Sequence, residues 1–141
     1  MRGVTCASAI VALAAAAIAA PQSPAMRTTK DEVFTAEQAR RGRALYDEHC
    51  SMCHGPSLGG VEMAPPLTGP EFYSNWSDLP VSDLFQRINL TMPQATPGSL
   101  GRRQDADIVA FIPSFNKAPA GQVELPADAD VLKTIRIVPT N

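Results

Sequence analysis

The residues with the clearest chemical potential form one pentapeptide, Cys50-Ser51-Met52-Cys53-His54. Two thiols three positions apart lie on the same side of a helical turn, and an imidazole follows at once. Thiols at this separation suit the two vinyl groups of a protoporphyrin, with which they form thioethers, and His54 can then ligate the iron through a neutral ring nitrogen. The pattern is typical of covalent attachment of a c-type haem.

Two other chemistries use the same residue types. A structural zinc site needs a second pair of Cys or His ligands elsewhere in the chain, but the remaining candidates are only His49, beside the pentapeptide, and Cys6. A redox-active dithiol of the thioredoxin type needs a βαβ pattern around the two cysteines, and none is visible. The sequence therefore favours one covalently attached haem per chain.

The N-terminus predicts export. Arg2 is followed by an almost unbroken apolar run to Ala20 that contains the small-x-small ending Ala17-Ile18-Ala19. This is the pattern of a secretory signal peptide, so we interpret residues 1–19 as a cleaved leader and expect a periplasmic protein. The alternative is an uncleaved anchor, which is the only way in which we expect a membrane to be involved.

Composition agrees with an exported redox protein. Thioether attachment takes place outside the bacterial cytoplasm, and loss of the leader leaves Cys50 and Cys53 as the only cysteines. Loss of Arg2 with the leader takes the formal net charge from −2 to −3. This mild acidity, without a basic face or an interleaved aromatic stripe, gives no indication of nucleic-acid binding.

The elements that must position the pentapeptide begin after residues 20–34, which read as a linker. Thr35-Ala36-Glu37-Gln38 has the form of a capping box, which predicts a helix that runs into Cys50. Gly42 and Tyr46 share one face of this helix. A glycine inside a helix costs about 1 kcal/mol relative to alanine, so Gly42 either admits another backbone or is a tolerated surface residue.

The rest of the chain predicts a loop, two helices and a tail. Glycine and proline dominate residues 55–70, which we interpret as a loop around the haem edge. An apolar stripe predicts a short helix over 80–90, and a second stripe predicts a helix over 101–112 that Pro113 should end or kink. Asp105 and Asp107 fall near the first turn of that second helix, where carboxylates suit the helix dipole. Residues 117–141 are expected to run over the domain surface.

These pieces resemble the class I, mitochondrial-like cytochrome c family, especially small periplasmic bacterial members with one haem. The resemblance covers roughly residues 36–115, and it rests on motifs that stand in the family's order. They are Gly42 and Tyr46, the pentapeptide, Ala64-Pro65-Pro66-Leu67-Thr68-Gly69, Met92-Pro93, and Ile108-Val109-Ala110-Phe111. The resemblance implies an all-α cytochrome c fold in which three to five short helices wrap around the haem. The haem domain would span 35–116, and its first and last helices would cross near Gly42 and Phe111.

The resemblance also assigns roles around the haem. A residue that matches Pro65 accepts the His54 ring N–H through its carbonyl. The second axial ligand is a methionine before the last helix, where Met92 stands; Met26, Met52 and Met63 compete less well by position. For Trp76, packing and donation of the indole N–H to a haem propionate are both open.

A His54/Met92 pair would fill both axial positions of the iron. It therefore implies a carrier of single electrons rather than an enzyme. A weaker resemblance of the C-terminal part, including Pro97-Gly98 and Glu124-Leu125-Pro126, is to the haem domains of quinoprotein alcohol dehydrogenases. It suggests a pyrroloquinoline quinone enzyme as donor, with a terminal oxidase or another cytochrome as acceptor. The alternatives are a haem subunit of a larger oxidoreductase and a peroxidase-like or sensor protein with an open iron site.

Overall fold

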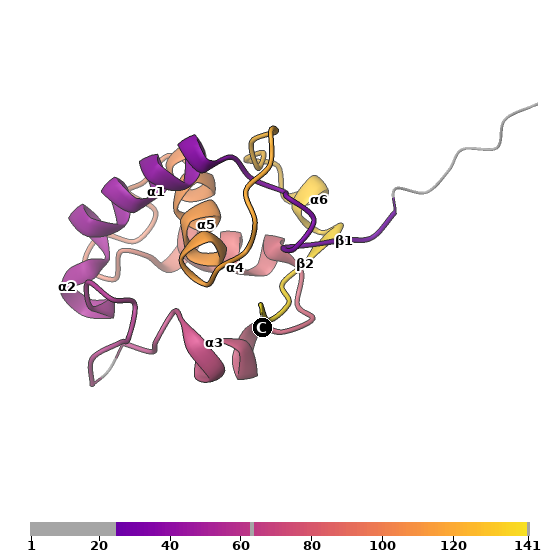
Figure 1. Ribbon diagram of the computed structural model, residues 1–141. Coiled ribbons are helices and arrows are strands. Elements are labelled where there is room, and N and C mark those ends of the chain that lie inside the picture. The colour runs from indigo at the N-terminus through magenta and orange to yellow at the C-terminus, as the bar shows by residue number, and fades with distance from the viewer. Residues whose placement is uncertain (1–24, 63, 141) are drawn as a thin grey trace, which may run out of the picture.

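The computed structural model describes residues 25–62 and 64–140, so the expected leader, 1–19, lies outside the described residues. The described part is mostly helical, which confirms the all-α expectation (Figure 1). Its helices are α1 (Ala36–His49), α2 (Ser51–His54), α3 (Gly69–Trp76), α4 (Val81–Thr91), α5 (Arg102–Phe115) and α6 (Ala129–Leu132). Two short strands, β1 (Arg27–Thr28) and β2 (Ile135–Arg136), pair in parallel, with Arg27 opposite Ile135. No helix among the described residues is long and apolar enough to cross a membrane.

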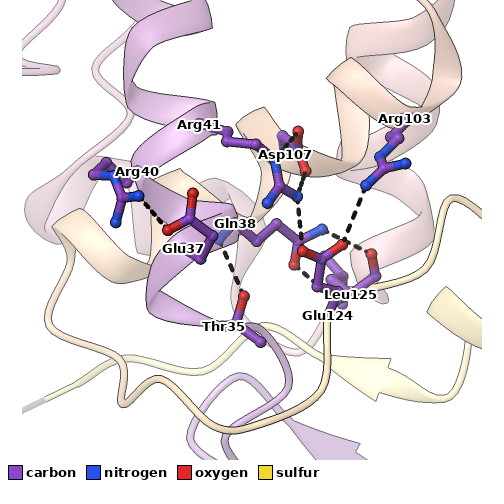
Figure 2. A network of polar contacts seen from close by, with 9 residues as sticks. All are labelled: Thr35, Glu37, Gln38, Arg40, Arg41, Arg103, Asp107, Glu124 and Leu125. Carbon is purple, nitrogen blue, oxygen red and sulfur yellow. Dashed lines mark hydrogen bonds and ion pairs between the residues drawn. The ribbon is translucent and has the colours of Figure 1, made fainter.

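Helix α1 begins as the sequence predicts, with one difference. Thr35 caps it, because its hydroxyl accepts a hydrogen bond from the Gln38 backbone N–H at 3.0 Å. The Gln38 side chain does not return to the cap as a capping box requires. Its amide instead donates to the Leu125 carbonyl at 2.9 Å, and its oxygen accepts from the Leu125 N–H at 2.7 Å (Figure 2). The buried Gln38 thus joins α1 to the C-terminal segment, residues 117–140.

Helices α1 and α5 approach each other closely at Gly42. A Cβ atom on Gly42 would lie 1.8 Å from the Asp107 carbonyl oxygen and 2.9 Å from the Phe111 Cβ, so only glycine fits. Next to this contact, the rings of Tyr46 and Phe111 lie 5.3 Å apart. Of the two interpretations of Gly42, admission of a second backbone is therefore the correct one.

Ion pairs reinforce this contact. Arg41 on α1 forms two hydrogen bonds to Asp107, at 2.9 and 3.0 Å, and a 2.9 Å ion pair with Glu124 (Figure 2). Arg103 lies 3.9 Å from the other oxygen of Glu124. The network therefore joins α1, α5 and the C-terminal segment at one place.

Helix α5 does not end where the sequence predicts. Pro113 was expected to end or kink it, but the helix continues to Phe115 and is capped by Asn116. The Pro113 carbonyl accepts a hydrogen bond from the Ala118 N–H at 2.9 Å. The helix stays well packed up to the proline, because Ile108, Phe111 and Ile112 are all buried.

Segments on both sides of 35–116 share the same core. Val33 and Phe34 are buried although they precede α1. The C-terminal segment contributes five buried apolar side chains, Ala118, Leu125, Leu132, Ile135 and Ile137. Figure 1 shows β1, β2 and α6 gathered at one end of the molecule, with α2 at the other. The tail therefore completes the core at the end opposite the pentapeptide.

The Gly42 contact predicts a large effect of one methyl group. Gly42→Ala should lower the free energy of unfolding by about 1–3 kcal/mol or more, because the Cβ meets backbone atoms that cannot rotate away. Urea unfolding of the holoprotein measures this. Gly101→Ser is the control, since a Cβ at Gly101 comes within 3.4 Å of only the end of the flexible Gln104 side chain. Equal stability of both variants would contradict the prediction.

The Gln38 contact predicts a second loss of stability. Gln38→Leu keeps the side-chain size but leaves the N–H and carbonyl of Leu125 buried without partners, at roughly 1–3 kcal/mol for each group. Glu37→Gln, next in sequence but exposed, should change the free energy of unfolding by less than about 0.5 kcal/mol. A Gln38→Leu protein as stable as this control would show that the C-terminal segment is only loosely attached.

Candidate functional site

The pentapeptide forms the short helix α2 directly after α1. The Cys53 and His54 N–H groups both donate to the Cys50 carbonyl, at 3.1 and 2.9 Å, which closes one helical turn. Cys50 and Cys53 are free thiols; the first is half-buried and the second exposed. The turn therefore presents two thiols and buries the imidazole of His54.

The ring of His54 is held by one hydrogen bond. Its Nδ1 lies 2.9 Å from the Pro65 carbonyl oxygen. Because a carbonyl can only accept, Nδ1 carries the ring proton and Nε2 keeps its lone pair. This arrangement orients the imidazole and raises its strength as a ligand.

The loop that supplies the Pro65 carbonyl is tied down along its length. The His54 carbonyl accepts from the Gly60 N–H at 2.8 Å, and a Cβ on Gly60 would lie 2.5 Å from the Ala64 carbonyl oxygen. Gly60 has a φ of +74°, in the left-handed region that favours glycine. Gly60 therefore lets the loop turn tightly under the imidazole.

Two further residues fix this loop, a role that their sequence context does not predict. The Tyr46 hydroxyl donates to the Gly55 carbonyl at 2.6 Å, and burial raises the pKa of Tyr46 to about 12. Asn116 donates to the Leu67 carbonyl at 2.9 Å and accepts from the Thr68 hydroxyl at 2.9 Å. The sequence identifies Tyr46 as part of a family motif but does not reveal its hydrogen-bond partner, the Gly55 carbonyl. A single asparagine after a helix gives no signal in the sequence.

The other two predicted site residues come from different elements. Met92 ends α4, where its N–H donates to the Ile88 carbonyl at 3.0 Å, and its side chain packs against the core. Trp76 ends α3 and stacks on Phe72, with ring centroids 6.4 Å apart. Among the described residues, no hydrogen bond joins the side chain of Met92 or Trp76 to the pentapeptide.

The environment of the thiols distinguishes the chemistries that they could perform. Burial, followed by the charges of Asp105 and Cys53, raises the pKa of Cys50 to about 11. Redox-active dithiols depend on a lowered thiol pKa, so this environment disfavours that alternative. Within residues 25–62 and 64–140, no group of three or more Cys, His, Asp or Glu side chains is placed to hold a metal ion. Two thiols and an oriented imidazole that do not converge on one point fit a haem held by two thioethers and one axial nitrogen.

Comparison with solved structures gives the same fold. The sulfane dehydrogenase SoxCD from Paracoccus pantotrophus contains a chain that matches this one with a TM-score of 0.51 and 19% sequence identity. The match covers 64% of this chain and 54% of the SoxCD chain, so this protein corresponds to about half of its length. No curated protein sequence matches the chain significantly.

A family comparison identifies the chain. The sequence model described as cytochrome C oxidase, cbb3-type, subunit III matches residues 37–112, from the first turn of α1 to Ile112 in α5. The match includes the pentapeptide, the loop with Pro65, and Met92. Because it covers more than half of the chain, the protein belongs to this family of c-type cytochrome domains, which bind covalent haem c and serve in electron transfer.

Proposed function

We propose that this protein carries single electrons on one haem c. Cys50 and Cys53 would hold the haem as thioethers, and His54 and Met92 would be the axial ligands. The observation that carries the proposal is the His54 ring, buried beside two free thiols and oriented by the Pro65 carbonyl. The haem, when bound, supplies a one-electron couple at its iron.

The surroundings of the methionines support Met92 as the second ligand. Met52 is 91% exposed and Met26 is 58% exposed, whereas Met92 is partly buried against the core. Met63 lies outside the described residues. A thioether is a soft, neutral ligand that raises the reduction potential. A haem iron held by both His54 and Met92 would have no free position for oxygen or peroxide, which would favour a carrier over an enzyme.

The remaining assignments extend this proposal. Trp76, half-buried at the end of α3, would donate its indole N–H to a haem propionate. Residues 1–19 would direct export to the periplasm and be removed, which mass spectrometry of the secreted protein would test. Domain bounds of 35–116 for the haem unit remain a proposal too, as does a pyrroloquinoline quinone dehydrogenase as donor.

A second candidate function is a haem subunit within a larger oxidoreductase. The description of the matching family, which names a subunit of an oxidase, favours it. The native mass of the protein, purified without detergent and then from solubilised membranes, separates the two. A monomer of about 13–15 kDa supports the free carrier, and a stable complex supports the subunit.

The ligand assignment predicts the effect of replacing Met92. Met92→Leu should abolish the weak far-red absorption band of the oxidised protein. It should also lower the equilibrium constant for reduction more than tenfold, or more than about 59 mV in midpoint potential. Met52→Leu is the control because its side chain is exposed, and it should leave both properties unchanged. An unaltered midpoint in Met92→Leu would exclude Met92 as the ligand.

The loop predicts a parallel effect on the other side of the iron. Gly60→Ala should displace the Pro65 peptide, because the new Cβ would lie 2.9 Å from the Pro65 carbonyl carbon. The weaker hydrogen bond to His54 makes it a poorer donor to the iron, so the midpoint potential should rise. The variant should also lose about 1–3 kcal/mol of stability.

The neighbouring glycine provides the control for Gly60. A Cβ on Gly59 would have only the Ser57 hydroxyl within 4 Å, at 3.5 Å. Gly59→Ala should therefore keep both the midpoint and the stability of the unmodified protein. If both variants shift the midpoint equally, the tight packing under His54 does not control the ligand.

A further inference from the structure

One buried carboxyl is not used by anything described so far. Asp105 lies in the first turn of α5 and is 0% exposed. Its Oδ2 accepts a hydrogen bond from the Asn89 side-chain amide at 2.7 Å. Its Oδ1 has no partner, and it is the only such buried side-chain nitrogen or oxygen in the described part of the chain. A carboxylate buried in this way is costly unless something offsets its charge.

Asp107, two residues further along the same helix, is a buried carboxylate whose charge is neutralised, and it serves as a comparison for Asp105. It is also buried, but Arg41 donates to both of its oxygens, at 2.9 and 3.0 Å. Asp105 has no such partner. Arg102 acts on it only through space, because its guanidinium donates to the Ala127 carbonyl at 3.0 Å and lies over the Phe85 ring.

Two neighbours of Asp105 belong to segments that would hold the haem. Asn89, its hydrogen-bond partner, lies on the last turn of α4, three residues before Met92. Cys50 lies on another side, close enough for the charge of Asp105 to contribute to the raised pKa of that thiol. Asp105 therefore lies near both the cysteine that would bind the haem and the helix that leads into Met92.

The charged and titratable groups around Asp105 are few. Helix α4 contributes the neutral Asn89, and α5 itself contributes Arg102. The junction of α1 and α2 contributes Cys50, whose sulfur cannot titrate once it is a thioether. The arginines of α1 that contact α5, Arg41 and Arg43, lie at Asp107 and over Phe111 instead.

We propose that Asp105 couples electron transfer to a proton, a role that rests on the proposed function. Asp105 is a carboxylate while the haem is oxidised and takes one proton from solvent, on a carboxylate oxygen, when the haem gains an electron. The electron comes from the redox donor and stays on the haem, and no other bond forms or breaks. A negative charge held in a medium of low dielectric favours the more positive, oxidised centre. By linkage, the centre in turn favours protonation when it is reduced.

Burial acts in the direction that this role needs. It raises the pKa of Asp105 from the ordinary value of 3.8, against the smaller opposing effects of Asn89 and Arg102. The carboxyl thus stays protonated to higher pH than an exposed aspartate, and its charge appears as pH rises through the raised pKa. The midpoint potential should accordingly be highest at acidic pH and fall as pH rises.

The test is the midpoint potential of the full-length holoprotein as a function of pH, measured by spectroelectrochemistry from about pH 4 to 9. Within part of this range, the equilibrium constant for reduction of the unmodified protein should fall by up to tenfold for each pH unit. This corresponds to a fall of about 59 mV in midpoint potential for each pH unit. Asp105→Asn should be nearly independent of pH and remain near the acid-limit value. Asp107→Asn is the matched control, because its charge is already paired, and it should keep the slope.

A second readout follows the proton itself. The reduced-minus-oxidised infrared spectrum should show a carboxylic acid C=O band that grows on reduction, that shifts in Asp105→Glu and that is missing in Asp105→Asn. An unchanged slope in Asp105→Asn would overturn the proposal and assign the pH dependence to the haem propionates. A pH-independent midpoint in the unmodified protein would overturn it as well, as would the absence of that infrared band.

The same samples separate this proposal from the proposed function. If the purified protein shows a reversible haem spectrum but a flat midpoint, electron transfer stands and the role of Asp105 fails. If the protein carries no redox-active haem, both fail together. Should Asp105→Asn not fold, the infrared band of the unmodified protein and its shift in Asp105→Glu still decide the outcome.

Discussion

The structure depends on the contact of two helix backbones at Gly42. Glycine at this position lets α1 touch the carbonyl of Asp107 in α5, and the helix that is fixed in this way leads directly into Cys50. Tyr46, one turn further along, packs on Phe111 and reaches the Gly55 carbonyl beyond the pentapeptide. The position of the thiols and the imidazole is thus set by packing between residues that are far apart in sequence.

The imidazole is oriented by a loop with little regular structure of its own. The loop is ordered because two buried polar groups each satisfy a backbone atom in it: the Tyr46 hydroxyl at its start, and the Asn116 amide near its end. Its apolar anchor is Leu58, which is fully buried and whose carbonyl accepts from the Leu67 N–H at 2.7 Å. A loop held in this way can present the Pro65 carbonyl to His54 with little freedom to move.

The sequence predicted most of what local patterns control. The cap at Thr35 and two helices follow from spacing and residue type. The helices were predicted over 80–90 and 101–112, and they lie at Val81–Thr91 and Arg102–Phe115. It did not predict α3, because Gly69 and Pro70 at its start look like loop residues although proline is well suited to a first helical turn. It also misjudged Gln38 and Pro113. The Gln38 side chain is hydrogen-bonded to the backbone of Leu125, which lies 87 residues away. For Pro113, the tertiary packing of α5 outweighs the local cost of a proline in a helix.

Asp105 and Asp107 show where sequence reasoning about a site reaches its limit. Both carboxylates fall near the first turn of one helix, and by sequence both suit the dipole equally well. The fold gives them opposite environments, since a two-residue step on a helix turns the side chain by about 200°. Asp107 faces α1, where the Arg41 guanidinium donates to it, whereas Asp105 faces α4, where only the Asn89 side-chain amide donates to it. Helix α5 therefore pairs one buried carboxylate with an arginine of α1 and keeps a second, unpaired one near Cys50. That division of roles is visible only once the partners of each helix face are known.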